Sequence, residues 1–311
     1  MMPVALFTHP ACLGHENGGY HPESPDRLRT VLQALEHPDF CALLRELAPE
    51  ATPAMLELAH PPDYVRALLA IQPPPGETVH LDGDTAMGHG SREAALRAVG
   101  GAVAAVDAVM EGWARAAFVA ARPPGHHAER KRPMGFCLFG TVAIAALHAR
   151  ARWGLKRIAV VDFDVHHGNG TQDILGTEPD ILFVSSHQYP CYPGTGSYEE
   201  RGVANNVLNL PLTPGATGPD FRRTWERVGL PALDVWAPEL IIVSAGFDAH
   251  RADPLAELRL DAEDFGWITD RLVDLAETHC GGRLVSSLEG GYDLAALAAS
   301  AALHVRRLMR Q

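Results

Sequence analysis

The sequence contains no pair of cysteines at a metal-binding spacing. Its five cysteines are odd in number, and no two of them form a Cys-x-x-Cys pair. A disulfide framework is expected to show an even, regularly spaced set, and a structural zinc site to show paired thiolates. The pattern therefore excludes both a disulfide scaffold and a thiolate zinc site.

Long apolar runs and a basic leader are also missing. No stretch reaches the roughly 18 apolar residues that a membrane-spanning helix needs. The first nine residues show no basic region followed by a long apolar run, as a secretion signal would. We therefore expect a cytoplasmic protein with no membrane partner.

Positive charge is scarce. The chain has 26 Lys and Arg residues against 38 Asp and Glu residues, a formal net charge of −12, and its only lysines are Lys131 and Lys156. An acidic protein has little general affinity for nucleic acid or for anionic membranes, and it attracts cationic ligands. We therefore expect no nucleic-acid partner.

The chain does contain apolar runs that alternate with longer Ala/Leu-rich runs from end to end. Strands are expected at residues 4–7, 117–121, 158–163, 181–185, 207–210, 240–244 and 284–287. Helices are expected at residues 25–35, 91–111, 141–152, 220–235, 262–278 and 294–309. Continuous apolar strands are typical of a sheet covered on both faces. This rhythm predicts a three-layer α/β/α fold with a mostly parallel central sheet, in one domain over residues 1–311.

The most informative segment is residues 158–169, where an apolar strand runs into Asp162, Asp164 and His166. Side chains alternate along a strand, so these three are expected to point the same way. Two carboxylates and an imidazole at a strand end are costly to desolvate unless a positive charge holds them. A metal ion is the simplest such charge.

Polar or glycine-rich turns follow five of the expected strands, at residues 122–127, 162–167, 185–187, 246–250 and 289–292. Ligands of parallel sheets bind beyond the carboxyl ends of the strands. We therefore expect the five turns to meet at one rim and to form the functional site.

Asp164, His166 and Asp248 are the candidate metal ligands. Two carboxylates and one imidazole leave a coordination position open, as in catalytic zinc sites. Fe(II), Co(II) or Mn(II) would accept the same ligands. The alternative, in which Asp164 caps a helix and His166 is a loop histidine, explains none of the other rim motifs.

His126 and His127 follow a stiff Pro-Pro-Gly turn, and Tyr292 follows two glycines. An imidazole titrates near neutrality, so a tandem pair could supply a base and an acid for hydrolysis, each oriented by Asp162 or Asn169. A phenol beside closely approaching backbone could donate to a developing oxyanion. Exposed loop histidines and a core tyrosine are the alternatives.

Taken together, these motifs closely resemble those of the histone deacetylase family, which has the arginase/deacetylase fold. The resemblance covers nearly the whole chain. Its motifs are His9-Pro10 and residues 21–27, 122–127, 135–137, 162–170, 192–196, 245–248 and 288–292.

The resemblance implies two cations and a catalytic set. One zinc ion would be held by Asp164, His166 and Asp248. A structural potassium ion would take oxygens from Asp162, Asp164, His166, Ser185 and Ser186. His127 would be the general base, oriented by Asn169. His126 would assist the leaving amine and would be oriented by Asp162. Tyr292 would hydrogen-bond the scissile carbonyl.

The resemblance also implies a substrate tunnel. Its residues would be Gly135, whose carbonyl could accept the substrate amide N–H, the walls Phe136 and Tyr192, the rim residue Leu255, and Gly290 of the Gly-Gly turn. Leu255 falls where polyamine-selective relatives place a carboxylate, which favours acyl-lysine. Tyr192 stands where Phe is usual, which leaves the acyl preference open.

Asn169 stands where class I members carry Asp, and residues 288–292 match the class II form. The expected function is therefore zinc-dependent hydrolysis of acetyl-lysine in proteins or peptides, by a class II type enzyme. The alternatives are an acetylpolyamine or other small N-acyl amide hydrolase, a ureohydrolase, which lacks support because no Asp-x-His-x-Asp occurs, and an inert acyl-lysine binding module. The oligomeric state stays open, with a homo-oligomer possible.

Overall fold

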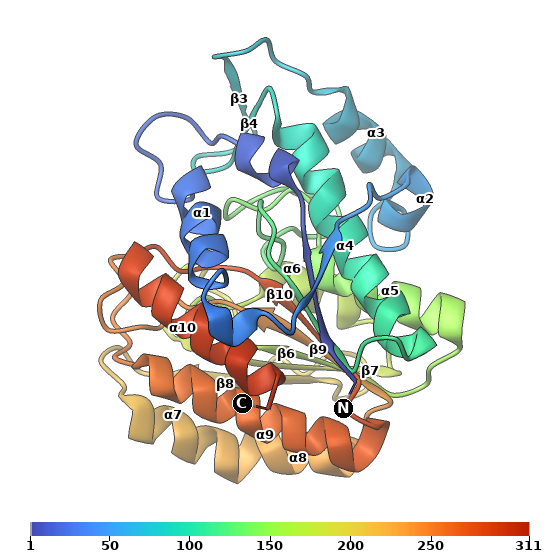
Figure 1. Cartoon of the computed structure of the whole chain (residues 1–311), viewed down its shortest axis with the longest axis vertical. Coiled ribbons are helices and arrows are strands. Elements are labelled where there is room, and N and C mark those ends of the chain that lie inside the picture. Colours follow the sequence, from blue (N-terminus) through green and yellow to red (C-terminus); the bar gives the residue numbers. More distant parts are fainter. Residues whose placement is uncertain (1, 311) are drawn as a thin grey trace.

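The computed structural model describes residues 2–310, in which eight parallel strands form one sheet in the order β2-β1-β5-β10-β9-β6-β7-β8 (Figure 1). The strands are β1 (Val4–Thr8), β2 (Leu44–Leu47), β5 (Ala116–Val119), β6 (Ile158–Asp162), β7 (Ile181–Gln188), β8 (Val207–Leu212), β9 (Leu240–Ala245) and β10 (Leu284–Leu288). The predicted mostly parallel sheet is confirmed.

The central strands are buried and mostly apolar because helices cover both of their faces. Every residue of β5, β6, β9 and β10 is buried. In register, Val160 of β6 lies between Phe183 of β7 and Ile242 of β9. Such β-branched and aromatic neighbours pack well on a pleated surface. The register of adjacent strands determines where their carboxyl ends lie relative to one another.

Two helical layers enclose the sheet (Figure 1). On one face lie α4 (Ser91–Glu111), α5 (Thr141–Trp153) and α6 (Asn169–Leu175), and on the other lie α1 (Pro25–Ala34), α8 (Leu230–Trp236), α9 (Ala262–Cys280) and α10 (Leu294–Leu308). The predicted three-layer arrangement is confirmed. Among residues 2–310, no helix is long and apolar enough to cross a membrane.

Several elements differ from the prediction. The strand β2, the hairpin of β3 (Thr78–His80) and β4 (Ala86–Gly88), and the helices α2 (Pro53–Leu56), α3 (Pro62–Ala70) and α6 were not predicted. The edge strand β2 is exposed along its whole length, so it has no continuous apolar signal. The helix predicted at 220–235 is α7 (Gly218–Thr224) and α8 joined by a π-helical turn, Trp225–Gly229. Pro231 explains the interruption, because it has no N–H to bond the carbonyl four residues earlier.

The strand order brings distant parts of the chain together. The adjacent strands β5, β10, β9 and β6 come from four regions of the sequence, because β10 and β9 return to fill the centre of the sheet. Their carboxyl ends therefore share one edge, where ligands of parallel sheets bind. The expectation of one domain over residues 1–311 stays a prediction.

Five histidines outside the predicted catalytic set are buried and held neutral. His304 is hydrogen-bonded through Nδ1 to Thr269 Oγ1 (2.7 Å) and through Nε2 to Ser286 Oγ (2.8 Å). Burial lowers its pKa to about 3. Burial is also the main cause that lowers the pKa of His167 to about 3 and that of His15, His60 and His187 to about 4.

We predict that acid weakens the fold through these histidines. In the unfolded chain His304 takes up a proton below pH ~6.5, whereas in the folded protein it does so only near pH 3. The contribution of neutral His304 to the free energy of unfolding is therefore complete above pH ~6.5 and is lost as the pH falls. When the pH falls from 6.5 to 4, the free energy of unfolding of His304→Gln should decrease by roughly 2–3 kcal/mol less than that of the unmodified protein. Chemical denaturation of chelator-treated protein at several pH values measures this, and parallel curves for the two proteins would contradict it.

Candidate active site

Two carboxylates and an imidazole converge beyond the carboxyl ends of β6 and β9. One donor atom from each of Asp164, His166 and Asp248 lies within 4.8 Å of the others, and all three residues are buried. His166 Nδ1 lies 3.1 Å from Asp164 Oδ1 and 3.1 Å from Asp248 Oδ2. The structure therefore places together the three ligands predicted from the sequence.

Backbone N–H groups hold the outer oxygens of these carboxylates. Gly290 N donates to Asp164 Oδ2 (2.9 Å), and Val165 N donates to Asp248 Oδ1 (2.8 Å). Burial and the nearby charge of Asp164 raise the pKa of Asp248 to about 7. A cation between the inner oxygens would relieve this repulsion, so the donor set fits a divalent metal ion.

The local geometry of Asp162 corrects one expectation. β6 ends at Asp162, so Asp164 and His166 lie in the turn that follows and do not share a strand face with it. Asp162 Oδ2 lies 2.9 Å from His126 Nδ1, and its other oxygen accepts the N–H of Asp164 (3.0 Å). The alternation predicted along one strand is therefore wrong beyond Asp162.

The two adjacent histidines have different environments. Their ring centroids are 4.0 Å apart, and His127 Nδ1 lies 2.7 Å from Asn169 Oδ1 whereas His126 is paired with Asp162. Burial opposes protonation of His126, but the charges of Asp164 and Asp162 outweigh it and raise its pKa to about 10. Burial lowers the pKa of His127 well below its ordinary value, helped by the charges of His126 and His166. Such divergent environments suit an acid and a base.

A buried glutamate that the sequence did not single out fixes the backbone of this histidine pair. Glu289 Oε2 accepts the N–H of Gly125 (2.7 Å) and that of His126 (3.2 Å). Burial is the main cause that raises its pKa to about 7. Its place just before the Gly-Gly turn was the only signal in the sequence.

Tyr292 follows β10 and is held by two further residues that the sequence did not single out. Its N–H donates to Asp253 Oδ2 (2.7 Å). The buried Arg27 donates to the carbonyls of Gly291 and Glu289 (2.5 Å each), and its guanidinium lies 4.7 Å from the centroid of the Tyr292 ring. A cation–π contact and hydrogen bonds to the backbone thus hold the tyrosine in place.

A cavity of about 180 Å³ opens beside these groups. It is lined by Asp84, His127, Gly135, Phe136, His166, Tyr192, Leu255 and Tyr292. The rings of His127 and Tyr192 lie 5.1 Å apart, and those of Phe136 and Tyr292 lie 6.0 Å apart. Asp84 is the one lining residue that the sequence did not indicate, since a lone loop carboxylate carries no signal.

Gly135, on the wall of the cavity, must be a glycine because the backbone there lies against the ring of His127. Gly135 has a φ of +56°, and a Cβ there would lie 2.4 Å from the ring of His127. Phe136 follows with a φ of +68°, which is rare for a bulky residue and fixes the direction of its ring. The predicted wall Gly135–Phe136 therefore packs directly on a predicted catalytic histidine.

Three other predicted residues lie around the cavity in different ways. Leu255 is at its mouth and is 37% exposed, so it can meet a bound ligand. Gly290 donates its N–H to Asp164, one of the predicted metal ligands, and does not line the cavity. Ser185 and Ser186 are buried on β7, where Ser185 Oγ lies 2.9 Å from His187 Nδ1 and Ser186 Oγ accepts the indole N–H of Trp225 (3.1 Å).

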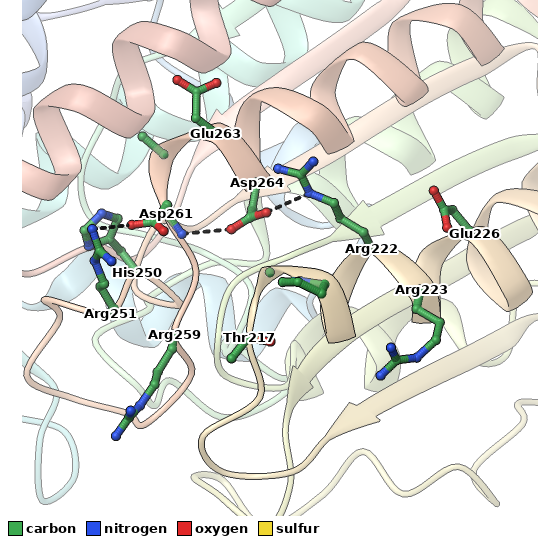
Figure 2. Close-up of a pocket in the computed structure, with 13 residues that line it drawn as sticks. Thr217, Arg222, Arg223, Glu226, His250, Arg251, Arg259, Asp261, Glu263 and Asp264 are labelled. Carbon is green, nitrogen blue, oxygen red and sulfur yellow. Dashed lines mark hydrogen bonds and ion pairs between the residues drawn. The ribbon is translucent and has the colours of Figure 1, made fainter.

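A much larger hollow, of about 1070 Å³, lies at the start of α7 and α9 (Figure 2). Figure 2 shows Arg222 turned toward Asp264, to which it donates a hydrogen bond (2.7 Å). Arg251 pairs with Asp261 at 2.9 Å. These two pairs neutralise part of the charge at its surface, and none of the predicted site residues lines this hollow.

Comparison with known proteins gives a consistent result. Residues 21–308 match the histone deacetylase domain family. The chain is 42% identical to a histone deacetylase-like amidohydrolase of Pseudomonas aeruginosa (93% of this chain, 81% of that protein) and 36% identical to a probable deacetylase of Archaeoglobus fulgidus (94% and 82%). Its structure matches the crystal structure of the HDA15 HD domain with a TM-score of 0.92 at 33% identity, over 99% of this chain and 88% of that one. The resemblance inferred from the motifs is confirmed.

We predict that Gly290→Ala weakens metal binding. A Cβ at this position would lie 2.1 Å from Asp248 Oδ2 and 2.6 Å from Asp164 Oδ2, so it would push the carboxylates out of place. Zinc affinity should fall roughly 10- to 100-fold, as measured by competition with a fluorescent chelator. Gly83→Ala is the matched control, because a Cβ there meets nothing within 4 Å. Equal affinity in the two variants would refute the prediction.

Proposed function

The chain belongs to the histone deacetylase family of hydrolases, and we propose that it removes acetyl groups from the ε-amine of lysine in proteins or peptides. The observation that carries the proposal is the narrow cavity between Phe136 and Tyr192, which reaches His127 and His166. A passage lined by two rings fits a linear alkyl chain that carries an amide at its inner end.

The metal that suits this reaction is zinc. Asp164, His166 and Asp248 supply two oxygen donors and one nitrogen donor from buried positions, a set that leaves a coordination position open. Zinc bound there supplies Lewis-acid activation of both water and the acyl carbonyl.

His127 is the general base in this proposal. Because its Nδ1 donates to Asn169 Oδ1, its proton is on that nitrogen and Nε2 keeps a free lone pair. The lowered pKa keeps the ring neutral at pH 7. His127 can therefore take a proton from the attacking water.

His126 and Tyr292 supply the remaining proton and hydrogen bond. The charges of Asp164 and Asp162 raise the pKa of His126 and keep it protonated, so His126 can assist departure of the leaving amine. The phenol of Tyr292 lines the cavity and can donate to the negative charge that develops on the acyl oxygen.

Two finer assignments complete the proposal. The pairing of His127 with the amide of Asn169 and the class II form of residues 288–292 support a class II type enzyme. A structural potassium ion is proposed at the oxygens of Asp162, Asp164, His166, Ser185 and Ser186. The cytoplasmic location stays a prediction.

A second candidate is hydrolysis of small N-acyl amines such as acetylated polyamines. The carboxylate of Asp84 at the cavity favours it, because it could attract a cationic amine. Leu255, an apolar residue at the mouth, opposes it.

We predict that Tyr292→Phe retains its zinc but loses turnover. Removing one donor to a developing oxyanion costs about 10²–10³ in kcat. The measurement is kcat on an acetyl-lysine peptide together with the zinc content of the purified variant. Tyr198→Phe, a change at an exposed tyrosine, is the control. Turnover equal to that of the control would exclude the role of Tyr292.

We predict that the unmodified protein hydrolyses an acetyl-lysine peptide faster than N-acetylputrescine, and that a chelator abolishes both reactions. Leu255→Glu should shift the ratio of the two kcat/KM values toward N-acetylputrescine by roughly 10-fold, because it adds a carboxylate for the distal ammonium. Leu255→Gln, similar in size but uncharged, is the control. Preference for N-acetylputrescine in the unmodified protein would establish the second candidate instead.

A further inference from the structure

Asn169 makes hydrogen bonds on both sides of its side-chain amide. Its Oδ1 lies 2.7 Å from His127 Nδ1, and its Nδ2 donates to Glu129 Oε1 at 2.8 Å. The three side chains therefore form a chain of hydrogen bonds that starts at a partly exposed carboxylate and ends at a buried imidazole.

The orientation of this amide decides which nitrogen of His127 carries the proton. With Oδ1 toward the imidazole, His127 must donate from Nδ1, and Nε2 is left as the acceptor. An amide turned by 180° would present its N–H₂ to His127, and the proton would then sit on Nε2. A general base needs the first arrangement.

Glu129 is the group that distinguishes the two orientations. A carboxylate accepts but does not donate, so it favours the Nδ2 side of Asn169. The other contact of Nδ2 is Met134 Sδ at 3.3 Å, and a thioether sulfur is a weak acceptor. Without Glu129, little would hold the amide in the required direction.

The backbone places Glu129 accurately despite its partial exposure. Glu129 and Arg132 form a tight turn through paired backbone hydrogen bonds (2.9 and 3.4 Å). Arg130 N donates to Asp173 Oδ2 on α6 (2.8 Å), and Thr171 N of the same helix donates to the carbonyl of His126 (3.1 Å). These bonds tie the segment that carries Glu129 to the helix that begins at Asn169.

Close packing brings the two elements into contact. A Cβ on Gly170 would lie 2.3 Å from the carbonyl oxygen of Ala128, so α6 approaches the histidine segment as closely as glycine allows. Asn169 and Glu129 each neighbour this contact in the sequence, and their side chains meet beside it.

We propose that Glu129 is a positioning residue that sets the tautomer of His127 through the amide of Asn169. The proposal rests on the proposed function, in which His127 is the general base. Glu129 acts through Asn169 and lies outside the catalytic cavity.

The test exchanges hydrogen-bond donors and acceptors at Glu129 and Asn169 in the zinc-loaded enzyme. Glu129→Lys places a donor opposite Nδ2 and should turn the amide, so kcat on an acetyl-lysine peptide should fall roughly 10- to 100-fold with KM changed little. Asn169→Asp alone places two carboxylates together and should also lower kcat. In the variant that carries both substitutions, the introduced ammonium can donate to the introduced carboxylate, which again accepts from His127, so kcat should return to within about threefold of the unmodified enzyme.

Two further variants separate positioning from fold damage. Glu129→Gln keeps an acceptor oxygen but adds a donor, so it should lower kcat by less than Glu129→Lys does. Glu111→Lys makes the same charge change at an exposed position at the end of α4 and should leave kcat unchanged.

A spectroscopic measurement makes the test independent of turnover. ¹⁵N spectra of histidine-labelled, zinc-loaded protein, with the His127 signals assigned by their loss in His127→Phe, should show a protonated Nδ1 in the unmodified protein and in the double variant. In Glu129→Lys the protonated nitrogen should be Nε2 or a mixture. An unchanged tautomer and a kcat within twofold in Glu129→Lys, or no rescue in the double variant, would overturn the proposal. Inactivity of the unmodified protein on every acyl substrate would instead overturn the proposed function, and the spectra would still decide the role of Glu129.

Discussion

Negative charge buried at the carboxyl ends of the central strands is the constraint on which the site depends. Asp162, Asp164, Asp248 and Glu289 are each at most 1% exposed and share a small volume. Isolated buried carboxylates are very costly unless they are neutralised, hydrogen-bonded or paired with a cation. The protein meets this cost with backbone N–H groups from three turns, with two histidines, and with a set of donors that fits a metal ion.

This arrangement explains why glycine recurs at the site. Gly246, Gly290 and Gly135 lie where a Cβ would meet a carboxylate or an imidazole within about 2.0–2.4 Å. At Gly290 the close approach also serves a hydrogen bond, because its backbone N–H donates to Asp164 Oδ2. The same packing leaves His126 and His127 in different surroundings, although they are neighbours in the chain and chemically identical.

The fold and the central residues were largely predictable from the sequence. Continuous apolar runs identified β6, β9 and β10 because these strands are covered on both faces, and polar residues directly after them identified Asp164, His166 and Asp248. The exposed strand β2 had no such signal. Glu289, Arg27, Asp253 and Glu129 were not identified either, because their importance lies in partners far along the chain: Arg27, for example, bonds the carbonyl of Gly291.

The sequence by itself therefore determined the fold class, the residue types that can hold a metal, and the candidate acid, base and oxyanion donor. Only the tertiary structure decided how these groups are paired. The strand order sets β10 and β9 between β5 and β6 and so brings their carboxyl ends to one edge. At that edge the oxygen of Asn169 faces His127 and its nitrogen faces Glu129. Hydrogen bonds depend on distance and direction, and neither quantity is written in the order of the residues.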